Sequence, residues 1–187
     1  MPPRAYRLGR RQTSVDRTRT EIISAARRLV TARPAAELKV GAVARAAGVS
    51  RITIYSRFGS RAGLIAALSP PSPAAALALD GDPQAQLRTR IATTCAHWAA
   101  DPAMYRNLNP SDPAGEIALD RGLAERLAAA DRLRPGCSIK EAEDVIATLT
   151  SFPVFDRLHR DGRRPPAAVA DILWRLASAI LAQDSIG

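Results

Sequence analysis

Basic, hydroxyl and aromatic side chains between residues 50 and 61 have the types and spacing needed to bind nucleic acid. Arginine donates paired hydrogen bonds to guanine, isoleucine packs on the thymine methyl group, and hydroxyl or basic side chains hold phosphates. We expect Arg51 and Ile52, with Ser56 as a third candidate, to reach base edges. Tyr55 is expected to hold a phosphate or to pack within its own domain. The complete set of candidate DNA-binding residues is Ser50, Arg51, Ile52, Thr53, Tyr55, Ser56, Arg57 and Arg61.

Two short helices joined by a glycine turn must position these side chains. A first helix is expected over residues 40–47, and a second helix follows Ser50, whose hydroxyl is a suitable N-cap. Gly48 between them supplies the left-handed conformation of a tight turn. Ile54 and Phe58 lie four residues apart, so they share the face of the second helix that packs inward. The pattern predicts a helix-turn-helix whose second helix enters the major groove of DNA.

The order of residues in this segment is more specific than a single glycine turn. Its informative positions are Val43-Ala44, Ala47-Gly48-Val49-Ser50, Thr53-Ile54-Tyr55, Phe58, Ser60 and Arg61. This order resembles the DNA-binding segment of the TetR family of transcriptional regulators, and the match covers about the first third of the chain. The resemblance implies an all-α fold: an N-terminal three-helix helix-turn-helix domain followed by a C-terminal helical domain for ligand binding and dimerisation. It also implies that the basic residue at position 61 contacts the DNA backbone.

Two positions depart from the pattern of that family. Lys39 stands where the family usually has Ser or Thr, so the first helix loses a side-chain cap worth roughly 1 kcal/mol. Ile52 stands where the family usually has Gly. Because Ile52 is expected on the exposed side of the second helix, we expect this change to alter which bases are recognised.

Positive charge is concentrated at the N-terminal end of the chain. Residues 1–68 hold fourteen basic and three acidic residues, whereas the remainder holds thirteen basic and fifteen acidic residues. Neutralising phosphates releases condensed counterions, so this end should bind DNA with an affinity that falls as salt rises. A basic surface that only keeps the protein soluble is the alternative.

Proline and glycine positions divide the chain. The expected segments are a basic mobile arm at 1–13, a helix-turn-helix domain at 14–68, a Pro-rich linker at 69–82 and a helical effector-binding and dimerisation domain at 83–187. The first helix of the second segment is expected to begin after Ser14. In the last segment, three Asp-Pro pairs and a capping box at Ser138 mark helix starts.

Aromatic and thioether side chains in the last segment are candidates for an apolar ligand pocket. The candidate ligand-binding residues are Trp98, Met104, Tyr105, Phe152 and Phe155, with His97 or His159 beside them. Such side chains often line pockets, although an ordinary core role is the alternative. The family resemblance implies a small-molecule cavity in this region, and we expect a small apolar or aromatic effector.

The final helix, expected from about Pro165, carries an apolar arc wider than one core face requires. We therefore expect a homodimer, with a central helix of a monomer as the alternative. The family resemblance also implies homodimers built from the last two helices. The candidate interface residues are Val145, Leu149, Val169, Leu173, Trp174, Leu176 and Ile180.

Other classes of protein find little support in the sequence. We find no catalytic motif, no cofactor-binding motif and no metal-ligand spacing, and Cys95 and Cys137 stand alone. No apolar run is long enough to span a bilayer, and the start lacks the apolar stretch of a signal peptide, so a cytoplasmic protein is expected.

We therefore expect a transcriptional regulator that binds double-stranded DNA at a palindromic operator, most simply a repressor released by a small-molecule effector. The alternative is a helical ligand- or protein-binding bundle with only nonspecific affinity for nucleic acid.

Overall fold

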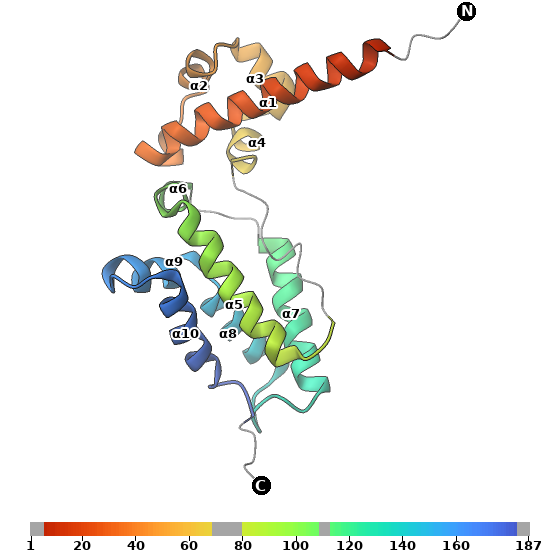
Figure 1. Cartoon of the computed structure of the whole chain (residues 1–187), viewed down its shortest axis with the longest axis vertical. Helices are drawn as coiled ribbons and strands as arrows, with labels where there is room; N and C mark the ends of the chain where they lie inside the picture. Colours follow the sequence, from red (N-terminus) through yellow and green to blue (C-terminus); the bar gives the residue numbers. More distant parts are fainter. Residues whose placement is uncertain (1–5, 69–79, 109–112, 183–187) are drawn as a thin grey trace, which may run out of the picture. The chain divides into compact units, whose positions relative to one another are not determined.

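A computed structural model describes residues 6–68, 80–108 and 113–182, with side chains placed for 16–68, 80–108 and 116–182 (Figure 1). All regular elements in these ranges are helices, and one isolated antiparallel bridge joins Leu133 to Leu181. The predicted all-α fold is confirmed. None of the helices in the described ranges has both the length and the apolar character that crossing a membrane requires. The chain divides into two compact units, 1–70 with 103–110, and 71–102 with 111–187.

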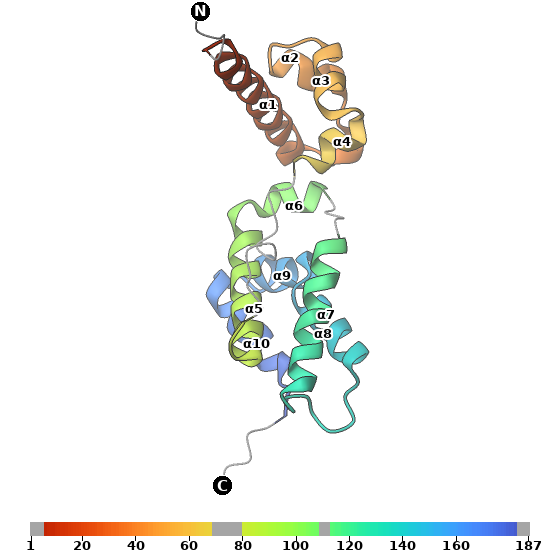
Figure 2. The same cartoon turned by 90° about the vertical axis from the view of Figure 1, so that its right-hand side faces the viewer.

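The first unit contains the helix-turn-helix. Its elements are α1 (Tyr6–Ala32), the 3-10 turn η1 (Ala35–Glu37), α2 (Val40–Ala46), α3 (Arg51–Phe58), α4 (Arg61–Ala66) and most of α6 (Pro102–Leu108). Helices α2, α3 and α4 lie together on one side of α1 (Figure 2). Their shared core consists of fully buried apolar side chains, among them Ile22, Val30, Val43, Ile54 and Leu64. Burial of these side chains holds the three short helices against the long one.

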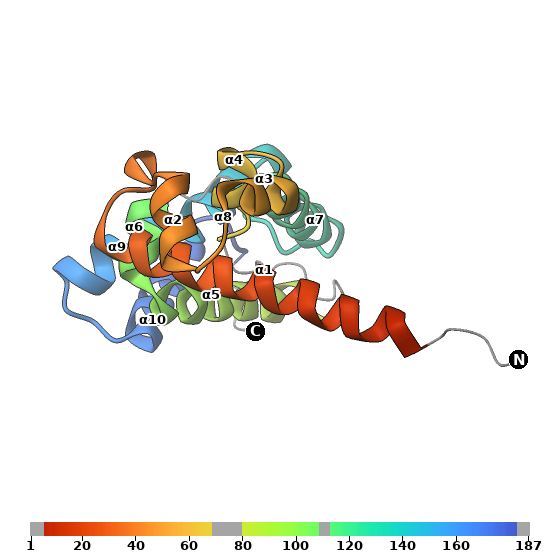
Figure 3. The same cartoon turned by 90° about the horizontal axis from the view of Figure 1, so that it is seen from above.

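Helix α1 begins at Tyr6, before the predicted start after Ser14. The mobile arm predicted over residues 1–13 is therefore corrected for residues 6–13, which are helical, whereas residues 1–5 lie outside the described ranges. The prediction required an apolar stripe for helix formation. A helix that already exists grows by one hydrogen bond per residue and needs no further packing, so α1 continues beyond the other helices of its unit (Figure 3).

Local signals place the turns of this unit as predicted. Gly48 adopts a left-handed φ of 66° between α2 and α3. The hydroxyl of Ser50 accepts a hydrogen bond from the Thr53 amide at 3.0 Å, and that of Ser60 accepts one from the Gly63 amide at 3.0 Å. Lys39 at the start of α2 makes no side-chain cap, as expected. Most of the predicted linker, residues 69–79, lies outside the described ranges.

The second unit is a helical bundle. Its elements are α5 (Pro83–Ala100), α7 (Pro113–Ala129), α8 (Ile139–Leu149), α9 (Phe152–Asp156), the π-helical turn η3 (Arg157–Asp161) and α10 (Pro166–Ala177). Helix α7 packs on α8, and α5 packs on both α7 and α10. Asp82 caps α5 by accepting from the Ala85 amide at 2.8 Å, and Ser138 caps α8 by accepting from the Glu141 amide at 3.1 Å. Pro153 stands in the first turn of α9, so it begins a new helix rather than bending α8.

The end of α10 differs from its prediction. Helix α10 ends at Ala177, and Ile180 lies in the turn that follows. The Ile180 carbonyl accepts a hydrogen bond from the Arg134 amide at 3.0 Å. Ile180, a candidate interface residue expected on the final helix, therefore lies beyond the end of that helix. Val169, Leu173 and Ile180 are at most 1% exposed within the single chain, so they are core residues rather than surface residues. Their packing within one chain accounts for much of the wide apolar arc.

Candidate nucleic-acid interface

Helix α3 has one buried face and one exposed face. Ile54 is completely buried, while Ile52 and Tyr55 are 79% and 47% exposed. Phe58 is half-buried, with the Arg19 guanidinium 4.9 Å from the centre of its ring. Because the inward face is used by the core of the unit, the side chains expected to read bases all lie on the surface of α3.

Ser50 and Thr53 are partly committed to the structure of α3. Besides accepting from the Thr53 amide, the Ser50 hydroxyl lies 2.9 Å from the Thr53 hydroxyl. Thr53 is half-buried, and so is Arg57 near the end of the helix. Arg51 and Ser56, in contrast, are exposed. The predicted residues therefore lie together on α3, but with different freedom to reach a partner.

A positively charged hollow of about 510 Å³ lies beside α3 in this unit. Its walls come from η1, the first turns of α2, and the side chains of Arg51, Tyr55 and Arg61. Lys39 and Arg45 add two further cations, against the single carboxylate of Glu37. The Arg51 guanidinium packs directly over Gly41. A Cβ atom added at Gly41 would lie only 2.8 Å from the nearest guanidinium nitrogen. The hollow thus gathers positive charge that suits an anionic backbone.

Arg61 is exposed, and it makes hydrogen bonds that the sequence did not predict. Its Nε donates to the Leu38 carbonyl at 2.8 Å, and one terminal nitrogen donates to the carbonyls of Ala35 and Ala36 at 2.7 Å each. These bonds use three of the five N–H groups of the guanidinium. The side chain lines the hollow, but most of its donors face backbone rather than solvent.

The aromatic residues expected to bind a ligand fall into two groups. In the second unit, the rings of Trp98 and Phe152 meet edge to face, with their centres 5.5 Å apart. The ring centres of Phe152 and Phe155 are 6.4 Å apart. Two histidines flank this aromatic cluster. The ring centre of His97 is 5.1 Å from that of Trp98, and the ring centre of His159 is 5.0 Å from that of Phe155. All three larger rings are buried, so they pack as core side chains in the described structure.

Met104 and Tyr105, the other two ligand-binding candidates, are buried residues of α6, which belongs mostly to the first unit. The structure therefore does not place them in the same unit as the aromatic cluster. Sequence order was misleading here because α6 follows α5 directly along the chain.

A buried ionic cluster in the second unit was not anticipated. Arg90 of α5 is 1% exposed and pairs with Glu116 at 2.8 Å and Asp120 at 3.3 Å, both on α7. It also donates to the Thr94 hydroxyl at 2.9 Å. A signal existed in the sequence, since Arg90 lies on the helical face of Leu87, Ile91 and Thr94, which is the buried face of α5.

Titratable groups around Arg90 are shifted by burial. Burial raises the pKa of the Asp120 carboxyl to about 6, although the adjacent Arg90 opposes that shift. Burial also lowers the pKa of His97, against the opposing charge of Glu116. Arg90 needs carboxylate partners because an unpaired charge in this position is strongly unfavourable. The cluster therefore ties α5 to α7 and places a pH-sensitive acid between them.

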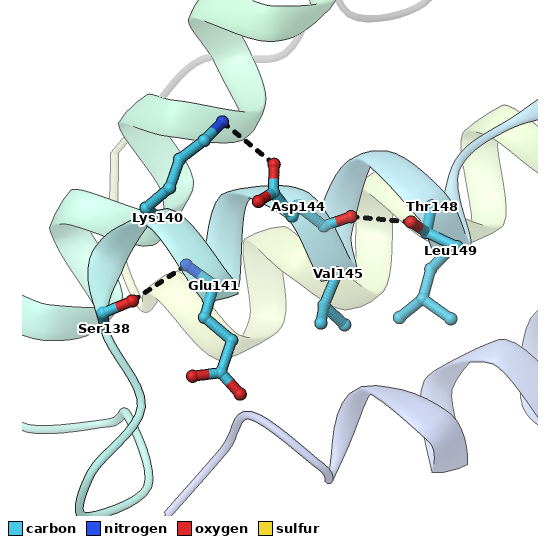
Figure 4. Close-up of a pocket in the computed structure, with 7 residues that line it drawn as sticks. All are labelled: Ser138, Lys140, Glu141, Asp144, Val145, Thr148 and Leu149. Carbon is cyan, nitrogen blue, oxygen red and sulfur yellow. Dashed lines mark hydrogen bonds and ion pairs between the residues drawn. The ribbon is translucent and has the colours of Figure 1, made fainter.

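A second hollow, of about 490 Å³, runs along the surface of α8 (Figure 4). Val145 and Leu149 project from α8 to the same side, while Lys140 pairs with Asp144 at 2.9 Å on another side (Figure 4). Val145 is half-buried, and Leu149 is buried. Of the interface candidates, Val145, Trp174 and Leu176 keep exposed surface, and Leu176 is 53% exposed.

Comparisons with known proteins agree with the N-terminal fold. Residues 22–68 match the family described as bacterial regulatory proteins, tetR family, which confirms the resemblance seen in the sequence. No curated protein sequence matches the chain.

Solved structures extend the likeness over most of the chain. NalD of Pseudomonas aeruginosa, the secondary repressor of the MexAB-OprM multidrug efflux pump, has a TM-score of 0.68 and 22% identity, covering 92% of this chain and 99% of NalD. The fatty acid degradation regulator FadR of Bacillus halodurans has a TM-score of 0.69 and 17% identity, covering 86% and 94%. FadR of Bacillus subtilis, solved with stearoyl-CoA, has a TM-score of 0.66 and 15% identity, covering 84% and 96%. The likeness shows that the two-unit helical fold is shared.

Replacing Asp120 by Asn tests the ionic cluster. Because the pKa of Asp120 is about 6 in the folded chain and ordinarily 3.8, the native state holds a proton between these values that the unfolded chain releases. The free energy of unfolding of the unmodified protein should therefore fall relative to Asp120→Asn as pH rises from about 4 to 6, by at most about 3 kcal/mol. Urea unfolding at several pH values measures this difference. The neighbouring titratable groups His97, Glu116 and Glu143 are the same in both proteins, so they do not account for a difference between them. If the free energy of unfolding changed with pH equally in the two proteins, the prediction would be contradicted.

Proposed function

Because residues 22–68 match the tetR family of bacterial regulatory proteins, we propose that the chain is a sequence-specific transcriptional regulator that represses until a small molecule releases it from its operator. The observation that carries the proposal is the two-sided α3. Its Ile54 face is used by the core, and its exposed face adjoins a hollow lined by four basic side chains. A DNA-binding regulator of this kind acts in the cytoplasm.

In this proposal the exposed residues of α3 divide into two roles. Ile52 and Ser56 reach base edges, with Ile52 packing on a thymine methyl group. Arg51 reaches a base once its guanidinium leaves Gly41, and Tyr55 and Arg57 hold phosphates on either side. Ser50 and Thr53 contribute mainly by capping α3, which fixes the depth at which the helix enters the groove.

Selecting bound duplexes from a random pool tests this division. Ile52→Ala should change the preferred base at one position of each half-site, because the isoleucine contact with one base is lost. Arg57→Gln should keep the sequence preference but reduce the slope of log affinity against log salt by about 1.8, the share of one phosphate in each of the two half-sites. The selected site should be palindromic and bound at least about a thousandfold more tightly than random duplex.

Ile54→Ala is the matched control for Ile52→Ala. The first removes a fully buried side chain and should destabilise the first unit by about 2–5 kcal/mol, whereas the second should leave stability nearly unchanged. An unmodified protein that binds all duplexes equally would favour the alternative of a helical bundle with nonspecific affinity.

A palindromic operator requires a second copy of the chain, and we place the contact on α8 and α10. The support is the exposed apolar surface of Leu176 together with the half-buried Val145 and Trp174. A two-fold interface would place the same residues opposite one another, as in a four-helix contact. The remaining interface candidates, being buried in one chain, would support these residues from behind.

Replacing Leu176 by Glu should convert the dimer to a monomer at micromolar concentration, because the interface would then bury two carboxylates without partners. Sedimentation analysis measures the change. Ile117→Glu is the control, since Ile117 is also an exposed apolar residue, 48% exposed, but lies on α7. Equal behaviour of the two variants would remove α10 from the interface.

Release by an effector rests on the second unit, where buried rings lie beside a buried ionic cluster. We propose that an apolar or aromatic molecule binds at the aromatic cluster and favours a dimer geometry that no longer matches two major grooves about 34 Å apart. Long-chain fatty acids, acyl thioesters and aromatic amphiphiles are suitable probes. Those that raise the melting temperature of the protein should lower operator affinity at least about tenfold. Ligands that stabilise the protein but leave operator affinity unchanged would contradict the mechanism.

A further inference from the structure

Arg61 occupies the first position of α4 but makes its contacts far back in the chain. Its three hydrogen bonds reach carbonyls of η1 and of Leu38, 23 to 26 positions earlier. The bonds are short, at 2.7–2.8 Å, as charge-assisted hydrogen bonds are. A planar guanidinium offers its donors in a fixed fork, so it holds several carbonyls in one arrangement.

The segment that Arg61 holds leads directly into α2. Leu38 precedes Lys39, the N-cap residue of α2, and Lys39 supplies no side-chain cap. The amides of Ala42 and Val43 both donate to the Lys39 carbonyl, so the first turn of α2 depends on where Lys39 is placed. The hydrogen bond from Arg61 to the Leu38 carbonyl holds the residue before Lys39, although it satisfies no free amide of α2.

We propose that Arg61 is a positioning residue for DNA binding, which acts by fixing the start of α2 relative to α4 rather than by holding a phosphate. The inference rests on the proposed DNA-binding function. Arg61 shapes the hollow in which Lys39, Arg45 and Arg51 present their charges. Three of its five N–H groups are already bonded to backbone carbonyls, so few donors remain for a phosphate.

Arg61→Lys and Arg61→Gln distinguish the two roles. A lysine keeps the charge and still reaches a phosphate, but its single ammonium does not bridge three carbonyls. A positioning role predicts that both variants lose about tenfold or more in operator affinity, with an unchanged salt slope. In the absence of DNA, the hydrogen-exchange rates of the Leu38, Ala42 and Val43 amides should be at least about tenfold higher in both variants than in the unmodified protein.

The matched comparison is Arg57, which is expected to hold a phosphate. Arg57→Gln should reduce the salt slope by about 1.8, one phosphate in each half-site, and Arg57→Lys should restore it, with amide exchange near residue 40 unchanged in both. Rescue of operator affinity by Arg61→Lys, or a reduced salt slope with unchanged amide exchange in Arg61→Gln, would overturn the proposal. If the unmodified protein has no specific operator, the DNA-binding function fails, while amide exchange still decides whether Arg61 fixes the start of α2.

Discussion

Burial of Ile54 is the contact on which the arrangement of the first unit depends. A helix of eight residues is rigid, so placing one side chain in the core sets the direction of all the others. With Ile54 inward, Ile52 and Tyr55 face outward, and the hollow with the cations Lys39 and Arg45 of the α2 segment lies beside the helix. Gly48 and Ser50 make this possible locally, because one turns the chain and the other begins the helix at the required residue.

One cation of the second unit, Arg90, lies in an environment opposite to that of most cations of the first unit. In the first unit most cations remain at the surface, where they attract an anionic partner at little cost in desolvation. In the second unit Arg90 is buried, and the cost of removing it from water is offset by Glu116, Asp120 and Thr94. The same residue type therefore serves recognition in one unit and helix packing in the other. The strong positive charge of residues 1–68 and the slightly negative charge of the remainder agree with this division.

Several features could be predicted because their causes are local. Gly48 requires a left-handed turn, and Ser50, Ser60, Asp82 and Ser138 cap helices within three residues of themselves. Features that depend on distant packing were predicted poorly. The end of α10 before Ile180 and the assignment of α6 to the first unit follow from neighbours that periodicity does not reveal. The N-terminal extension of α1 was missed for another reason, because a helix that already exists continues without a packing partner.

The amino-acid sequence by itself determined the helix-turn-helix, its resemblance to the TetR family and the concentration of positive charge, because these depend on residue types and on spacings of a few positions. Only the tertiary structure decided which arginine faces solvent, which binds backbone and which is buried. Arg61 finds Ala35 and Arg90 finds Glu116 across 26 positions in each case. Side-chain spacing along a helix does not identify such partners, since they are brought together by the packing of separate helices.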